Sequence, residues 1–114
     1  MNAKLYGLKK CSTCKKALDW FSSEGIAHEF TDYREQPLAP DDLVGWAQQV
    51  GWTKVVNRAS MTWRQLDESL KDPQTDEEWL GLIRSHEALV RRPVIVTSKG
   101  VQFGFNLKKL PEIL

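Results

Sequence analysis

The stretch from Ala3 to Leu18 reads AKLYGLKKCSTCKKAL and joins a short apolar segment, a loop with two cysteines and the start of a helix. Its first six residues are mostly apolar and run into lysines, which is typical of a buried strand followed by a loop. The helix is expected to be capped by Ser12 and to end at Gly25, since four apolar residues recur on one face: Cys14, Ala17, Leu18 and Phe21. Residues 26–33 have the Phe, Tyr and Thr content of a second strand. The opening third therefore predicts a β-α-β unit with parallel strands.

The middle of the chain, from about residue 38 to residue 90, predicts only helices and loops. Pro40 suits the first turn of one helix, and Thr62 and Thr75 each begin a capping box for a further helix. Four of the five tryptophans lie here, and we interpret them as packing residues: Trp46, Trp52, Trp63 and Trp79. This middle third is predicted to be a helical insert.

The last third predicts a hairpin. Residues 93–97 and 101–105 have the β-branched and aromatic content of two strands around a turn, and a short helix is expected from about Leu107. The order of elements predicts a single domain over residues 1–114 in which helices interrupt a four-stranded mixed sheet, as in the α/β or α+β classes; we expect α/β.

Composition narrows the classes of function. The chain has 114 residues, of which 41% are hydrophobic and 27% charged, as in a globular domain with a hydrophobic core. Sixteen basic and fifteen acidic residues leave a net charge of +1, which argues against a dedicated nucleic-acid binder. No run approaches the ~20 apolar residues of a membrane span, and no signal peptide is visible. We therefore expect a cytoplasmic protein that binds neither nucleic acid nor membrane.

The two cysteines form a Cys-x-x-Cys pair at the predicted N-terminus of the first helix. Unpaired backbone N–H groups and partial positive charge at such a terminus stabilise a thiolate, and four lysines flank the pair: Lys9, Lys10, Lys15 and Lys16. A thiol with a pKa near 8.5 is only about 3% thiolate at pH 7, whereas a pKa of roughly 6 makes it about 90% thiolate. Cys11 is therefore the predicted nucleophile, and Cys14 is a candidate resolving thiol.

Other uses of the pair stay open. Cys14 shares the apolar face of its helix, so a packing role is an alternative. A zinc site would need two further ligands, and the only histidines are His28, in a mixed strand, and His86, which continues an apolar helix face. We expect no metal.

Arginines supply a candidate anion site. Arg92 precedes Pro93 at the start of a predicted strand, and its guanidinium can bind a carboxylate or an oxyanion through two hydrogen bonds. Arg58 has the same capacity. Arginines in such sequences are also typical of solvated loops. Arg92 and Arg58 therefore indicate an anion site only in combination with the cysteine pair.

These motifs together resemble the arsenate-reductase-like family that includes ArsC, Spx and YffB-type proteins, most closely the YffB-type branch. The resemblance covers nearly the whole chain and depends on these segments: Lys4-Leu5-Tyr6-Gly7 leading to Cys11, Lys15-Lys16-Ala17, Asp32-Tyr33-Arg34, Asn57-Arg58, Thr62-Trp63-Arg64 and Arg92-Pro93-Val94-Ile95. It implies a thioredoxin-like sheet with an inserted helical subdomain, and a cis proline at position 93 that faces the cysteine loop.

The resemblance implies chemistry only where residues match. Cys11 matches the catalytic cysteine of the arsenate reductases, Arg92 matches one of their three oxyanion arginines, and Arg58 lies within one position of a second. The third arginine falls at about Phe105, and the histidine found before the cysteine is replaced by Gly7. Both losses count against arsenate reduction.

We predict a thiol–disulfide oxidoreductase that uses Cys11 as its nucleophile and glutathione as its co-substrate. No bound cofactor is expected, and the partners would be glutathione or a small thiol or disulfide, with glutaredoxin as a candidate protein partner. The residues expected to bind the substrate or glutathione are Arg92, Pro93, Arg58, Thr13 and Lys10. One alternative is an arsenate reductase, and another is a redox-sensing, Spx-like regulator that binds a protein partner such as RNA polymerase.

Overall fold

The computed structural model describes residues 2–114. They form two compact units, one made of residues 2–37 and 92–114 and the other of residues 38–91. The first unit contains the sheet and the second contains the insert helices. No helix within residues 2–114 is both long and apolar enough to cross a membrane.

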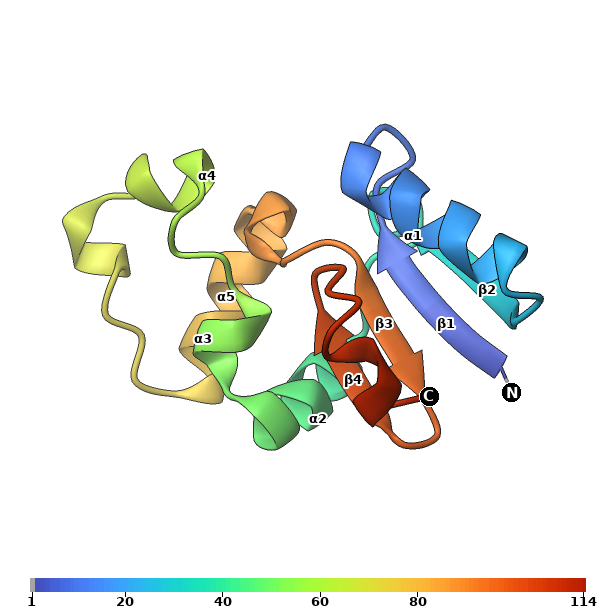
Figure 1. The fold of residues 1–114 in the computed structure, drawn as a ribbon. Helices are drawn as coiled ribbons and strands as arrows, with labels where there is room; N and C mark the ends of the chain where they lie inside the picture. Colours follow the sequence, from blue (N-terminus) through green and yellow to red (C-terminus); the bar gives the residue numbers. More distant parts are fainter. Residues whose placement is uncertain (1) are drawn as a thin grey trace. The chain divides into compact units, whose positions relative to one another are not determined.

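The first unit is built on a four-stranded sheet with the strand order β2-β1-β3-β4 (Figure 1). β1 (Asn2–Gly7) runs parallel to β2 (Ala27–Asp32) on one side and antiparallel to β3 (Val94–Thr97) on the other. β4 (Gly100–Phe103) completes a hairpin with β3. The predicted four-stranded mixed sheet is confirmed.

The helix α1 (Ser12–Ser23) connects the two parallel strands. Its N-cap is Cys11, so the prediction that Ser12 caps the helix is wrong by one residue. Cys11 has the extended backbone of a cap, and its carbonyl already accepts the N–H of Lys15 at 3.1 Å. Gly25 ends the helix as predicted, with a φ of 67° that favours glycine.

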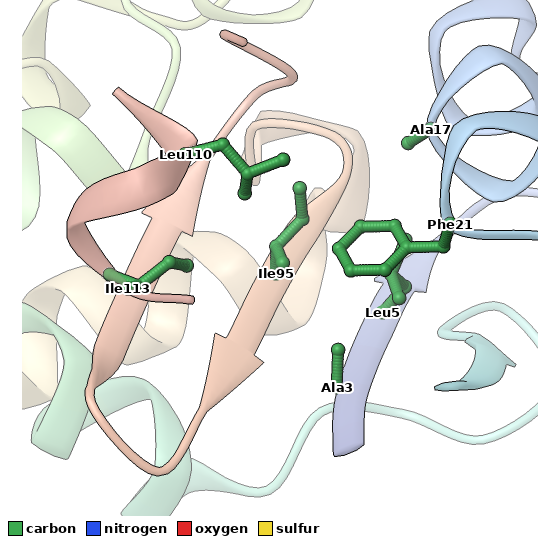
Figure 2. Packing of buried hydrophobic residues seen from close by; sticks show 7 residues of the cluster. All are labelled: Ala3, Leu5, Ala17, Phe21, Ile95, Leu110 and Ile113. Carbon is green, nitrogen blue, oxygen red and sulfur yellow. The ribbon is translucent and has the colours of Figure 1, made fainter. Parts of the chain in front are cut away.

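A hydrophobic core packs α1 and the C-terminal segment, residues 110–113, against the sheet. Phe21 of α1 reaches over β1 towards Ile95 of β3 (Figure 2). The buried cluster is completed by residues of β1, α1 and the C-terminal segment: Ala3, Leu5, Ala17, Leu110 and Ile113. This packing holds the carboxyl end of β1 and the first turn of α1, which carry the cysteines, on a rigid support.

Two expectations for the C-terminal third need correction. β4 ends at Phe103 instead of residue 105, because Gly104 has a φ of 86° and its N–H donates to the carbonyl of Pro93 at 2.9 Å. The helix expected from about Leu107 is a single 3-10 turn, η3 (Leu110–Glu112). In a helix that began at Leu107, Pro111 would lack the N–H that should donate to the carbonyl of Leu107, whereas it is tolerated in the first turn of η3.

The second unit contains short helices. Their bounds are α2 (Pro40–Val50), α3 (Trp52–Val55), α4 (Met61–Arg64), η1 (Glu68–Leu70), α5 (Asp76–Ser85) and η2 (Glu87–Leu89). Pro40 opens α2 as predicted, and Thr75 caps α5 by accepting the N–H of Glu78 at 3.2 Å. The cap predicted at Thr62 is wrong. Ser60 caps α4 instead, because its hydroxyl accepts the N–H of Trp63 at 3.2 Å.

The insert tryptophans pack against one another. Trp79 stacks on Trp52 with ring centroids 5.8 Å apart and on Trp63 with centroids 6.1 Å apart. The indole N–H of Trp52 donates to Asp76 at 2.8 Å. Trp46 is buried. These contacts support the interpretation of the insert tryptophans as packing residues.

Candidate functional site

Residues from three segments of the first unit meet at the carboxyl end of β1. Cys11 follows β1, and Cys14 lies in the first turn of α1. Tyr33 directly follows β2, and its backbone N–H donates to the carbonyl of Gly7 at 3.0 Å. Arg92 stands just before β3, with its Nη1 atom 3.5 Å from the phenol oxygen of Tyr33. The sheet thus brings two thiols, a phenol and a guanidinium together.

The Cys11 thiol is half-buried, and its pKa is lowered. Burial by itself raises this pKa, but several groups together outweigh it: the backbone N–H and the side chain of Cys14, the backbone N–H of Thr13 and the charge of Arg92. Position and charge therefore both favour the thiolate.

Cys14 is the opposite kind of thiol. It is buried, and its pKa is raised to about 11, mainly by that burial. The N–H of Leu8 lowers the pKa, whereas the hydrogen bond with Cys11 and the charge of that residue raise it. Cys14 therefore stays protonated at neutral pH and offers its S–H to the Cys11 sulfur.

Gly7 makes room for Cys14. A Cβ atom at position 7 would lie 2.4 Å from the Cys14 sulfur, far inside the distance at which real atoms touch. The sequence marks Gly7 only as the loss of a histidine expected from the family resemblance. The close approach supplies a physical reason for a residue without a side chain here.

Arg92 and Tyr33 form the polar side of the cluster. Arg92 is partly desolvated, which lowers its pKa, but the phenol of Tyr33 and the Cys11 sulfur outweigh this effect and raise the pKa. Burial raises the pKa of Tyr33, so the phenol is neutral at physiological pH even though Arg92 opposes the shift. Tyr33 is not among the site residues predicted from the sequence. The signals for it are its place at the end of the predicted strand 26–33 and in the Asp32-Tyr33-Arg34 segment of the family resemblance.

Hydrogen bonds and an ion pair connect the cysteine loop, residues 8–11, to the end of β2 and the residues that follow it. The Asp32 carboxylate accepts the backbone N–H of Lys9 at 2.9 Å and that of Arg34 at 2.8 Å. The Lys9 ammonium forms an ion pair with Glu35. The backbone N–H of Lys9 is the largest cause of the lowered pKa of Asp32. These bonds restrain the loop that leads to Cys11.

The other predicted site residues have separate positions. Lys10 and Thr13 are exposed beside Cys11. The Arg92–Pro93 peptide bond is cis, as the resemblance implies. Arg58 is exposed and belongs to the second unit. No cluster of three or more metal-ligating side chains occurs within residues 2–114.

The model of the ArsC family matches residues 6–113. The chain belongs to this family. An uncharacterized protein of Haemophilus influenzae is 37% identical over 105 residues, which are 92% of each chain. The global transcriptional regulator Spx of Listeria innocua is 26% identical over 96% of this chain and 85% of its own. A solved YffB protein is 31% identical over 98% of both chains, with a TM-score of 0.89. This ArsC-family chain is therefore similar both to a regulator and to proteins of the YffB type.

We expect the alkylation rate of Cys11 to rise with pH around a midpoint below that of an ordinary thiol. A lowered pKa means that the thiolate is already present at a pH where a free cysteine is protonated. Iodoacetamide labelling followed by mass spectrometry in a Cys14→Ser protein measures this, since serine keeps a hydrogen-bond donor at position 14. A midpoint at or above 8.5 would contradict the activation of Cys11.

Proposed function

We propose that this ArsC-family protein is a thiol–disulfide oxidoreductase that draws its electrons from glutathione. The observation that carries the proposal is the pairing of two unlike thiols. Cys11 is half-buried with a lowered pKa, and Cys14 is buried with a raised pKa. A thiol nucleophile has to be accessible and has to ionise readily, and the exposure and the lowered pKa of Cys11 favour both.

In the first step the Cys11 thiolate attacks one sulfur of a disulfide. A new S–S bond joins Cys11 to that sulfur, the old S–S bond breaks, and the second sulfur leaves as a thiolate that takes up a proton from water. In the second step a thiolate attacks the mixed disulfide at Cys11 and regenerates the Cys11 thiolate. With glutathione as that thiolate, this step gives a disulfide between glutathione and the remaining half of the substrate.

In a second round Cys11 attacks the glutathione sulfur of this disulfide, the substrate half leaves as a thiol, and a second glutathione removes the glutathionyl group from Cys11 as glutathione disulfide. Over both rounds, two glutathione molecules are oxidised to glutathione disulfide and the substrate disulfide is reduced by two electrons to two thiols.

Glutathione suits the second step better than Cys14 does. With a pKa of about 11, Cys14 supplies very little thiolate at neutral pH. Formation of the mixed disulfide removes the Cys11 charge that raises this pKa, but the burial that is its main cause remains. We therefore assign Cys14 chiefly to hydrogen bonding and keep resolution by Cys14 as a slower route.

The charges around Cys11 suit an anionic partner such as glutathione. In the proposal Arg92 binds a carboxylate of glutathione, and Lys10, Thr13 and Pro93 line the approach to the sulfur. The family resemblance is the reason to propose that Arg58 also binds glutathione or the substrate. A glutaredoxin would reduce any adduct that glutathione leaves, and glutathione-rich cytoplasm is the compartment that suits this chemistry.

The proposal is tested by turnover of the unmodified protein. Hydroxyethyl disulfide is mixed with glutathione, and glutathione disulfide is followed through NADPH consumption by glutathione reductase. The expected result is a rate that is proportional to protein concentration and well above the uncatalysed exchange. A rate no different from the protein-free reaction would refute the proposal.

A regulator is the second candidate function, because the cysteine pair accompanies 26% identity to Spx. In that case oxidation of Cys11 and Cys14 to a disulfide would change a binding surface without turnover. RNA polymerase pulled down equally by the oxidised and reduced protein, or not at all, would argue against it.

Arsenate reduction is less well supported. Phe105, near the position of the third family arginine, packs against the hydrophobic core, so no cation replaces that arginine there. Turnover with arsenate, glutathione and glutaredoxin tests this activity directly.

A further inference from the structure

Tyr33 and Arg92 approach the cysteine loop from opposite sides of β1. β2, which Tyr33 follows, lies on one side of β1, and β3, which Arg92 precedes, lies on the other. Their side chains nevertheless meet, with 3.5 Å between Arg92 Nη1 and the phenol oxygen. The contact joins residues 59 positions apart in the sequence. The contact holds a guanidinium whose positive charge is one of the causes of the lowered pKa of Cys11.

Tyr33 itself has little freedom to move. The residue is 1% exposed, and its backbone N–H donates to the carbonyl of Gly7. An acceptor on a fixed ring costs less conformational entropy than one on a mobile side chain. By contrast, Arg92 has a long side chain whose many rotamers must be restricted if its charge is to stay near one sulfur.

The protonation state of the phenol decides what the contact does. A phenolate would neutralise Arg92 and repel the Cys11 thiolate. Because burial keeps the phenol protonated, its oxygen accepts an N–H of Arg92 while leaving the full positive charge to act on the sulfur.

We propose that Tyr33 is a positioning residue that holds the guanidinium of Arg92 beside the Cys11 sulfur and thereby keeps this thiol ionised. The role concerns the same thiol as the proposed function, but it is read out by alkylation and does not depend on any turnover. A protein without reductase activity can therefore still confirm it, and an active reductase can still refute it.

The test replaces the phenol with a ring of the same shape. In Tyr33→Phe we expect the pH midpoint of Cys11 alkylation to rise by roughly half a unit, which is about threefold less thiolate at a pH below the midpoint. Tyr6→Phe is the matched control, because it removes the hydroxyl of the other tyrosine in the chain. The control should leave the midpoint unchanged. Thermal unfolding of each variant establishes that it is folded.

A double-mutant cycle separates positioning from a direct effect of the phenol. Arg92→Ala should raise the midpoint more than Tyr33→Phe does, and the double variant should match Arg92→Ala. An unchanged midpoint in Tyr33→Phe overturns the proposal. It is equally overturned if the full effect of Tyr33→Phe persists when Arg92 is absent.

A second measurement covers the case in which Tyr33→Phe does not fold. 3-Fluorotyrosine incorporated into the Tyr6→Phe protein places a single fluorine label at position 33. Its ¹⁹F resonance should move with pH at the Cys11 midpoint, and this movement should be absent in Cys11→Ser and reduced in Arg92→Ala. A resonance that does not follow the ionisation of Cys11 refutes the proposal.

Discussion

Cys11→Ser is expected to lose glutathione-dependent disulfide reduction by roughly a thousandfold or more. A serine hydroxyl is almost never ionised at neutral pH and is a poor nucleophile toward a disulfide sulfur, so the first bond cannot form. The substitution removes one sulfur from a half-buried position, and we expect the folded state to keep its stability within about 0.5 kcal/mol. The glutathione-coupled assay measures the loss, and thermal unfolding measures the stability.

Cys14→Ser is the matched control for this result. It makes the same change of sulfur to oxygen three residues away, and the serine hydroxyl can still donate a hydrogen bond to the Cys11 thiolate. Because glutathione can resolve the mixed disulfide, we expect at least a tenth of the activity to remain. Substantial activity in Cys11→Ser would show that the nucleophile lies elsewhere. Equal loss in both variants would mean that Cys14 is obligatory and that the cycle runs through an internal disulfide.

The sheet and α1 could be predicted because their signals are local. The apolar runs of β1 and β3 and the helical spacing of Ala17 and Phe21 each identify one element within a dozen residues. The glycine after α1 marks its end with the same certainty, since few other residues accept a φ of 67°. The first cysteine could be singled out for the same reason, because it directly precedes a helix.

Two of the wrong predictions concern helices that are a single turn long. One-turn helices such as α4 depend on which of several neighbouring serines and threonines reaches a backbone N–H. Ser60 and Thr62 are both common caps by residue type, and in the folded chain Ser60 caps the helix. In the C-terminal segment the sequence does not decide between a helix from about Leu107 and a shorter turn, and the structure has the 3-10 turn that contains Pro111.

The sequence predicts Arg92 as a site residue, but its contact with Tyr33 could not be predicted, because the two residues come together only in the folded chain. Arg92 and Tyr33 are separated by the whole insert in sequence and become neighbours through the strand order β2-β1-β3. Each residue can be found in a sequence motif, but nothing in either motif predicts that the two side chains are in contact. The fit of Gly7 to Cys14 is hidden in the same way, since it depends on the angle at which α1 returns over β1.

Gly7→Ala is expected to destabilise the protein by about 1–3 kcal/mol, the usual cost of forcing an extra methyl into a packed site. The new Cβ would lie 2.4 Å from the Cys14 sulfur, and Cys14 is buried on a helix that is itself packed on the sheet. The sulfur cannot easily move away, because the side chain has one rotatable bond. Urea unfolding, analysed as the change in the free energy of unfolding, measures this cost.

The Cys14→Ala background decides whether the sulfur causes the cost. Without it, the nearest atoms to an added Cβ at position 7 are Phe30 Cε1 at 3.4 Å and the Cβ of residue 14 at 3.5 Å, which are ordinary contacts. Alanine also restricts the unfolded chain more than glycine does, by about 0.4–1 kcal/mol. Gly7→Ala should therefore be neutral or slightly stabilising in Cys14→Ala. If it costs as much there as in the natural chain, the fit between Gly7 and the Cys14 sulfur is not the reason for the glycine. If the cost disappears, the two positions are coupled, and a larger residue at position 7 would be compatible only with a smaller residue than cysteine at position 14. The glycine in place of the family histidine at position 7 would then be a structural requirement of the second cysteine, Cys14, whose S–H stabilises the Cys11 thiolate.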